Sequence, residues 1–118
     1  MVDYISIALD NPTFINYIKD WSVKKEYNTT HDLLYIGICH NDKSKIGITH
    51  KNRVKNRENE WKKIMPDFQF VRTWHTNKIN AFHIEQFSHT LLKTIGLHYA
   101  SNDSKEIFNI VPLNSIQL

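Results

Sequence analysis

A tyrosine and a lysine in two neighbouring strand-like runs are the residues whose types and spacing first suggest chemistry. The runs span residues 33–40 and 43–49, and successive strand residues face opposite sides of a sheet. One face then carries Tyr35, Gly37, Lys45, Gly47 and Thr49. Because a glycine within a strand often marks the close approach of a ligand, this face suits a phosphate backbone. A helix packed tightly over the two glycines is the alternative.

The other face of the same two runs is aliphatic. It carries Leu34, Ile36, Ile38, Ile46 and Ile48, which we expect to form the buried side of a sheet. The link between the runs, residues 40–42, is short and turn-like, so the pair is predicted to form an antiparallel hairpin.

Positive charge is concentrated after this hairpin, although the chain as a whole carries a net charge of only +3. Residues 51–64 are predicted to form a basic helix that ends before Pro66. Its cationic residues are Lys51, Arg53, Lys55, Arg57, Lys62 and Lys63. Such a surface suits a polyanion. A core or rim position is expected for Trp61, with stacking on a base as the alternative. A solvated helix face that binds nothing is the alternative reading.

The remaining elements are predicted from caps and periodicity. Asn11 and Pro12 indicate the start of a helix over residues 12–26. Residues 68–75 are predicted to form a third strand, with Phe68, Phe70 and Trp74 on one face. A strongly periodic helix covers residues 77–95, and Gly96 follows as its C′ residue. The tail from residue 101 remains open between a short helix and a turn.

These elements predict an α+β domain in which helices flank a small three-stranded sheet. The 118 residues suit one domain, with residues 1–32 as an N-terminal helical extension packed on residues 33–118. Cys39 is the single cysteine, which excludes an internal disulfide and favours a reducing cytoplasm. No apolar run approaches the roughly 20 residues of a membrane span, and no secretory signal is expected.

The order of motifs resembles that of the GIY-YIG nuclease superfamily. Residues 33–35 (LLY) stand where GIY stands, and residues 45–47 (KIG) stand where YIG stands. A basic helix follows with NRV at residues 52–54, and residues 81–89 (AFHIEQFSH) resemble the glutamate-bearing third motif. KEIF at residues 105–108 is similar to the ending of a compact phage and bacterial branch whose second motif also reads Lys-Ile-Gly.

The resemblance implies a metal-dependent endonuclease that hydrolyses phosphodiester bonds of DNA, or RNA as an alternative. Tyr35 would activate water, Lys45 would assist electrostatically, and Arg53 would hold the scissile phosphate, with Arg57, one turn further along, as the alternative. Glu85 would hold Mg²⁺ or Mn²⁺, which needs only one carboxylate besides waters and substrate. His89 and Asn109 would lie in a second layer around the site.

The abundance of Asn, Lys and Ile suggests an AT-rich genome, such as that of a phage or its bacterial host, so we expect a protein of the bacterial or phage-infected cytoplasm. The same scaffold permits two other functions, a catalytically silent module that binds nucleic acid, or a small inhibitor of a host protein. The N-terminal helix, with Trp21 and the basic pair Lys24-Lys25, is a candidate surface for a homodimer or another partner.

Overall fold

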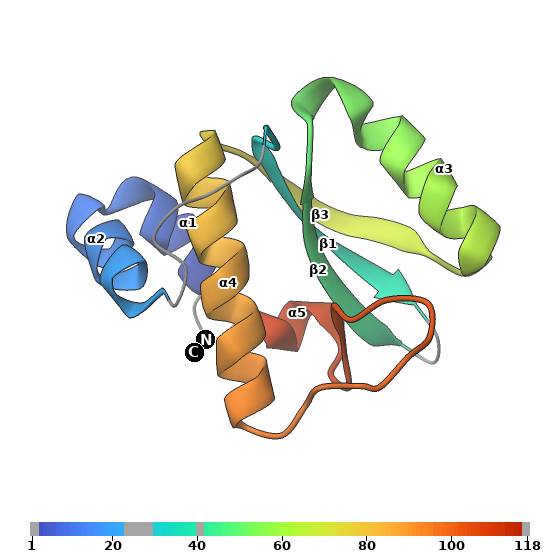
Figure 1. The fold of residues 1–118 in the computed structure, drawn as a ribbon. Coiled ribbons are helices and arrows are strands. Elements are labelled where there is room, and N and C mark those ends of the chain that lie inside the picture. The colour runs from blue at the N-terminus through green and yellow to red at the C-terminus, as the bar shows by residue number, and fades with distance from the viewer. Residues whose placement is uncertain (1–2, 23–29, 40–41, 117–118) are drawn as a thin grey trace.

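The computed structural model describes residues 3–22, 30–39 and 42–116, and Figure 1 shows their arrangement. Helices gather on both sides of a central sheet. In chain order the elements are α1 (Tyr4–Asp10), α2 (Pro12–Trp21), β1 (Leu33–Cys39), β2 (Lys43–Thr49), the 3₁₀ turn η1 (Lys51–Arg53), α3 (Val54–Ile64), β3 (Gln69–His75), α4 (Lys78–Thr94), β4 (Ile107–Phe108) and α5 (Pro112–Ser115).

The sheet is antiparallel with strand order β3-β1-β2-β4. The predicted hairpin is confirmed, because β1 and β2 pair along their whole length from Leu33↔Thr49 to Cys39↔Lys43. The α+β class is therefore confirmed, but the described sheet has four strands where three were predicted. The additional strand, β4, belongs to the tail that the sequence left open, and it pairs with β2 at Ser44 and Lys45.

The N-terminal region contains two short helices where a single helix was predicted. Asp3 caps α1 by accepting hydrogen bonds from two backbone amides, and Asn11 does the same for α2, with Pro12 in its first turn. The predicted helix over residues 12–26 is wrong at its end, because Ser22 has extended backbone and terminates α2. Residues 23–26, including Lys24 and Lys25, lie outside the described part of the chain.

The main core lies on the aliphatic face of the sheet, as predicted. Leu34, Ile36 and Ile46 are buried there against side chains of α1, α2 and α4, the helices drawn to the left of the sheet in Figure 1. The hydroxyls of Tyr4 and Ser88 are 2.6 Å apart within this core. The N-terminal helices therefore share one hydrophobic core with the sheet.

The opposite face of the sheet is closed by aromatic rings, and α3 covers it. A Cβ atom at Gly47 would lie 2.5 Å from the Tyr35 hydroxyl oxygen, and one at Gly37 would overlap the ring of Phe68. The two glycines therefore make room for the protein's own side chains. The prediction of an open face is wrong, and so is the alternative of a helix packed directly over the glycines.

Strand β3 contains a bulge that the predicted alternation missed. Ile36 pairs with Arg72 and Gly37 pairs with Phe70, so Val71 is the additional residue. The bulge reverses the alternation, which places Trp74 in the main core and leaves Phe68 and Phe70 beside Tyr35. The prediction that these three aromatic residues share a face is therefore wrong.

Helix α4 agrees with the prediction closely. Asn77 caps its N-terminus, and Gly96 adopts the left-handed conformation (φ 81°) just after its C-terminus. Within the described residues, no helix has both the length and the apolarity needed to span a lipid bilayer.

Replacing Gly47 with alanine tests the closed aromatic face. The new Cβ would meet a Tyr35 ring that is fully buried and hydrogen-bonded, so Gly47→Ala should destabilise the fold by about 1–3 kcal/mol in urea unfolding. Gly96→Ala is the comparison, because nothing lies within 4 Å of its Cβ and only backbone strain of about 1 kcal/mol opposes it. An unchanged urea midpoint for Gly47→Ala would contradict this packing.

Candidate functional site

Tyr35 lies at the centre of the aromatic layer between the sheet and α3. Its side chain is fully buried, and its ring centroid is 4.6 Å from that of Phe70. The indole Nε1 of Trp61 donates a hydrogen bond of 3.2 Å to the Tyr35 hydroxyl. Trp61, for which stacking on a base was the alternative prediction, therefore has a partner inside the protein.

Lys45 extends from β2 into the same layer, and its side chain has 0% exposure. Its ammonium group lies 2.5 Å from Oε1 of Glu106 and 4.2 Å from the centroid of the Trp61 ring. Burial acts to lower the pKa of Lys45, but the neighbouring Tyr35 and Glu106 together hold this pKa above its usual value. Lys45 is therefore expected to stay charged near neutral pH.

Glu106 brings Lys45 into contact with a second group of side chains. Glu85 and His89 lie one turn apart on α4, and Glu106 directly precedes β4. One potential ligand atom from each of these three residues lies within 4.8 Å of the others. The cluster sits beside the edge of β2, where the backbone amide of Ile46 donates to the carbonyl of Glu106.

The two carboxyl groups of this cluster have opposite pKa shifts. Burial, together with the charge of Glu106 and a hydrogen bond to it, raises the pKa of Glu85 to about 8. Burial also opposes ionisation of Glu106, but the charge of Lys45 and the hydrogen bonds from Lys45 and Glu85 outweigh it and lower the pKa of Glu106. At neutral pH the pair therefore holds one proton on Glu85 and one negative charge on Glu106, which Lys45 balances.

His89 is held as the neutral imidazole tautomer that leaves Nδ1 unprotonated. Its Nε2 lies 2.7 Å from the carbonyl oxygen of Ile46, and a carbonyl can only accept, so Nε2 carries the hydrogen. Burial lowers the pKa of His89, which keeps the ring neutral. An imidazole oriented through one nitrogen by a backbone carbonyl is the usual state of a metal ligand.

The donor set fits a divalent cation that prefers oxygen. Glu85 and Glu106 offer the hard carboxylate oxygens that suit Mg²⁺ and Mn²⁺, and the imidazole of His89 favours Mn²⁺ within that pair. Ligation would require the proton of Glu85 to leave and Glu106 to be shared with Lys45. Metal affinity at this cluster should therefore rise with pH.

The structure places Arg57, rather than Arg53, next to the tyrosine. The guanidinium of Arg57 lies 5.1 Å from the centroid of the Trp61 ring, and interactions with Tyr35 and Glu60 offset burial to raise the pKa of Arg57. Its Nε is buried without a hydrogen-bond partner. Arg53 has a 56% exposed side chain and pairs with Glu60 at 3.0 Å. Arg57, which was the alternative to Arg53 for holding the scissile phosphate, is therefore the better placed of the two arginines.

Two histidines without a predicted role lie beside these arginines. A small cleft of about 70 Å³ is lined by His31, Thr49, His50, Arg53, Arg57 and Glu60. The rings of His31 and His50 meet edge to face at 5.1 Å. Neither histidine belongs to a quoted motif, and only the fold brings their separate segments together.

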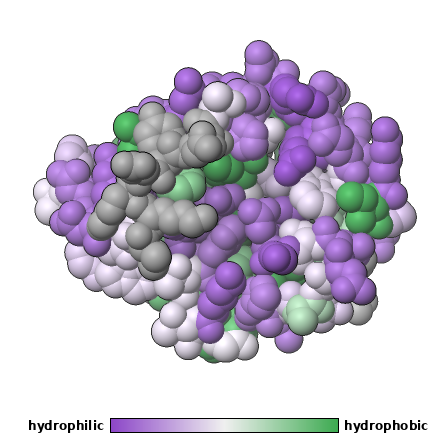
Figure 2. Space-filling view, in the orientation of Figure 1, coloured by the Kyte–Doolittle hydropathy of each residue, from purple (hydrophilic) through white to green (hydrophobic). Residues whose placement is uncertain are grey.

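Several predicted residues lie apart from the cluster. The cationic side chains of Lys51, Lys55, Lys62 and Lys63 are exposed along α3 and the turn before it. Figure 2 shows that hydrophilic side chains cover much of this side of the molecule. Asn109 is also exposed, although its backbone amide donates to the carbonyl of Leu97.

Glu106 is the functional residue that the motif argument missed. It stands inside the quoted KEIF segment, so its position was visible as part of a resemblance, but its pairing with Lys45 was not. The signal was the lysine at the second motif, since a buried ammonium requires an acidic partner.

Comparisons of this chain with protein-family models, with curated proteins and with solved structures find no match. The fold and the site define this protein as an α+β domain in which a buried lysine pairs with a carboxylate.

The high pKa of Glu85 predicts a pH-dependent stability in metal-free protein. The folded state holds the Glu85 proton more tightly than the unfolded chain, whose value is near 4.5. This stabilisation is complete below pH 4.5 and is lost as the pH rises through about 8. Wild type should therefore lose stability relative to Glu85→Gln across that window, measured by urea unfolding in EDTA.

Asp67→Asn is the control, because Asp67 is exposed on the loop after α3. Its stability should follow that of wild type at every pH. A difference between wild type and Glu85→Gln that stays constant from pH 5 to pH 9 would contradict a protonated Glu85.

Proposed function

We propose that this protein is a divalent-metal-dependent endonuclease of the GIY-YIG type that cleaves DNA. The observation that supports the proposal most strongly is one continuous set of contacts across the site. Arg57 adjoins Tyr35 and Trp61, Lys45 lies between these rings and Glu106, and Glu106 meets Glu85. Motif residues that lie far apart in the sequence therefore all contribute to this one set of contacts.

The residues divide the work of phosphodiester hydrolysis among them. Arg57 supplies a guanidinium for the scissile phosphate. Lys45 places a permanent positive charge 5.5 Å from the centroid of the Tyr35 ring, where it stabilises negative charge that develops beside the phenol. A cation held by Glu85 and Glu106 would stabilise negative charge on the leaving oxygen. Tyr35 orients water once the indole of Trp61 moves off its hydroxyl.

A second candidate function is a silent module that binds nucleic acid or a protein. Tyr35 and Lys45 both have 0% exposure, and Lys45 is already neutralised by Glu106. The exposed lysines of α3 would bind a polyanion without any chemistry at these groups. Tyr17 and Trp21, 57% and 42% exposed on α2, offer a surface for a protein partner, as the inhibitor alternative requires.

Cleavage assays separate the two candidates. Wild type should nick supercoiled plasmid or cut labelled single strands in Mg²⁺ or Mn²⁺ and not in EDTA. Glu85→Gln should lower the rate at least about 100-fold, because the cation loses a charged ligand. Asp67→Asn should cut at the wild-type rate. A folded wild type that retards DNA in a gel but never cuts it would favour the silent module.

The two arginines are expected to differ in the same assay. Arg57→Ala should reduce kcat by roughly 10²–10³-fold, the range found when one donor to a developing charge is removed. Arg53→Ala should change kcat less than Arg57→Ala and should mainly weaken binding. The reverse order would show that Arg53 moves into the site and that its exposed pairing with Glu60 is not the working state.

A further inference from the structure

A second basic site lies at the C-terminal end of α4 and in the loop after it, close in sequence to His89 and Glu106. It is a surface hollow of about 350 Å³ lined by Lys93, His98, Ala100, Ser101, Asn102 and Lys105. Lys93 follows His89 by one turn on α4, and Lys105 directly precedes Glu106. The hollow is thus connected to the candidate metal ligands through both of the segments that carry them.

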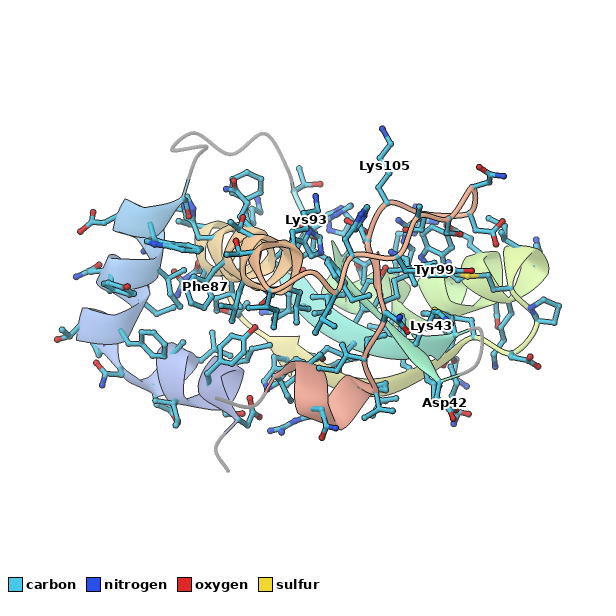
Figure 3. The ribbon with its side chains drawn as sticks, turned by 90° about the horizontal axis from the view of Figure 1, so that it is seen from below. Asp42, Lys43, Phe87, Lys93, Tyr99 and Lys105 are labelled. Atoms are coloured by element: carbon cyan, nitrogen blue, oxygen red, sulfur yellow. The ribbon has the colours of Figure 1, made fainter. Side chains whose placement is uncertain are left out.

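The hollow is positively charged, and its two lysines are accessible to a ligand. Lys93 and Lys105 are exposed, and within the described residues neither forms an ion pair. The acidic side chain of the same loop, Asp103, does not line the hollow and lies near enough to Cys39 to influence its pKa. Figure 3 shows Lys93 and Lys105 projecting on the same side of the molecule.

The loop that forms the hollow is held in place by hydrogen bonds to backbone carbonyl groups. Nε2 of His98 lies 3.0 Å from the carbonyl oxygen of Lys105 and donates to it, and His98 also pairs with Phe108 in a β-bridge. The backbone amide of Tyr99 donates to the carbonyl of Ile107. These bonds hold Lys105 in place beside the cluster, so an anion bound there meets a partly preorganised site.

A polynucleotide with one phosphate at the carboxylate cluster must extend in both directions from it. Helix α3, which carries Arg57 and several lysines, lies at the upper right of Figure 1, whereas the C-terminal end of α4 and the loop after it lie at the bottom. One strand passing over the cluster would therefore meet cations before and after the point of reaction. The hydroxyl of Ser101 and the amide of Asn102 add neutral polar groups suited to sugar or base atoms.

We propose that the hollow between Lys93 and Lys105 is a subsite for a backbone phosphate of the nucleic acid, next to the reacting phosphate. This inference rests on the proposed function for its substrate, and it adds a contact outside the quoted motifs. A phosphodiester ligand fits because two exposed lysines line one hollow of about 350 Å³.

The test is equilibrium binding in EDTA, which separates binding from cleavage. Fluorescence anisotropy of a labelled single-stranded 20-mer is measured at several salt concentrations for wild type and for the double variant Lys93→Ala/Lys105→Ala. Each lost contact with a single strand should reduce the slope of log K against log salt by about 0.7, so the double variant should lose about 1.4. The control is Lys19→Ala/Lys78→Ala, which removes the same charge elsewhere and should keep the wild-type slope.

The outcomes distinguish this inference from the proposed function. An unchanged slope in Lys93→Ala/Lys105→Ala, with wild type both binding and cutting, would overturn the subsite and leave the nuclease standing. An equal loss of slope in the control variant would also overturn the subsite. So would an equal loss of slope when labelled polyglutamate is bound, because both results would indicate general attraction of anions. If Lys93→Ala/Lys105→Ala loses slope but wild type never cuts, the result would support the phosphate contact and refute the nuclease.

Discussion

The ion pair between Lys45 and Glu106 is the interaction on which the rest of this structure depends. A fully buried ammonium is stable only with a partner close by, because desolvation of an unpaired charge costs several kcal/mol. That partner lies 61 positions away in the chain, and holding it in place fixes β4 against the edge of β2. The same carboxylate then meets Glu85 and His89, so one pair joins the aromatic layer under α3 to the donor cluster beside α4.

The pair also explains why two acidic groups coexist in a small space. Lys45 neutralises the charge of Glu106, and Glu85 retains a proton that it would lose in water. The centre is thus balanced at neutral pH without an ion, and a cation would enter only by displacing a proton and weakening the lysine contact. Under the proposed function, occupancy of this site by a cation would therefore depend on metal concentration and pH together.

Much of the fold was predictable from local signals, and the failures share one physical origin. Periodicity and caps located α4, the β1–β2 hairpin and the start of α2, because each depends on residues near in sequence. The glycines were interpreted as space for a ligand because a sequence shows where a side chain is missing and does not show what fills the gap. Tyr35 and Phe68 fill those gaps through tertiary packing, and the bulge at Val71 likewise depends on pairing with β1. Glu106 was missed for the same reason, because its pairing with Lys45 is a contact across the sheet edge between residues 61 positions apart. Tyr35, Lys45 and Glu85 were proposed from their motifs, and their roles stay predictions.

The measurement that tests the central claim most directly is a crystal structure with Mn²⁺, using anomalous scattering to locate the ion. The account predicts one peak bounded by Glu85, His89 and Glu106, with carboxylate oxygens at about 2.0–2.3 Å, near the range for small divalent cations, and with Lys45 moved away from at least one oxygen of Glu106. A map without a peak at this cluster at millimolar Mn²⁺ and pH 8.5, with the Lys45–Glu106 pair intact, would contradict it.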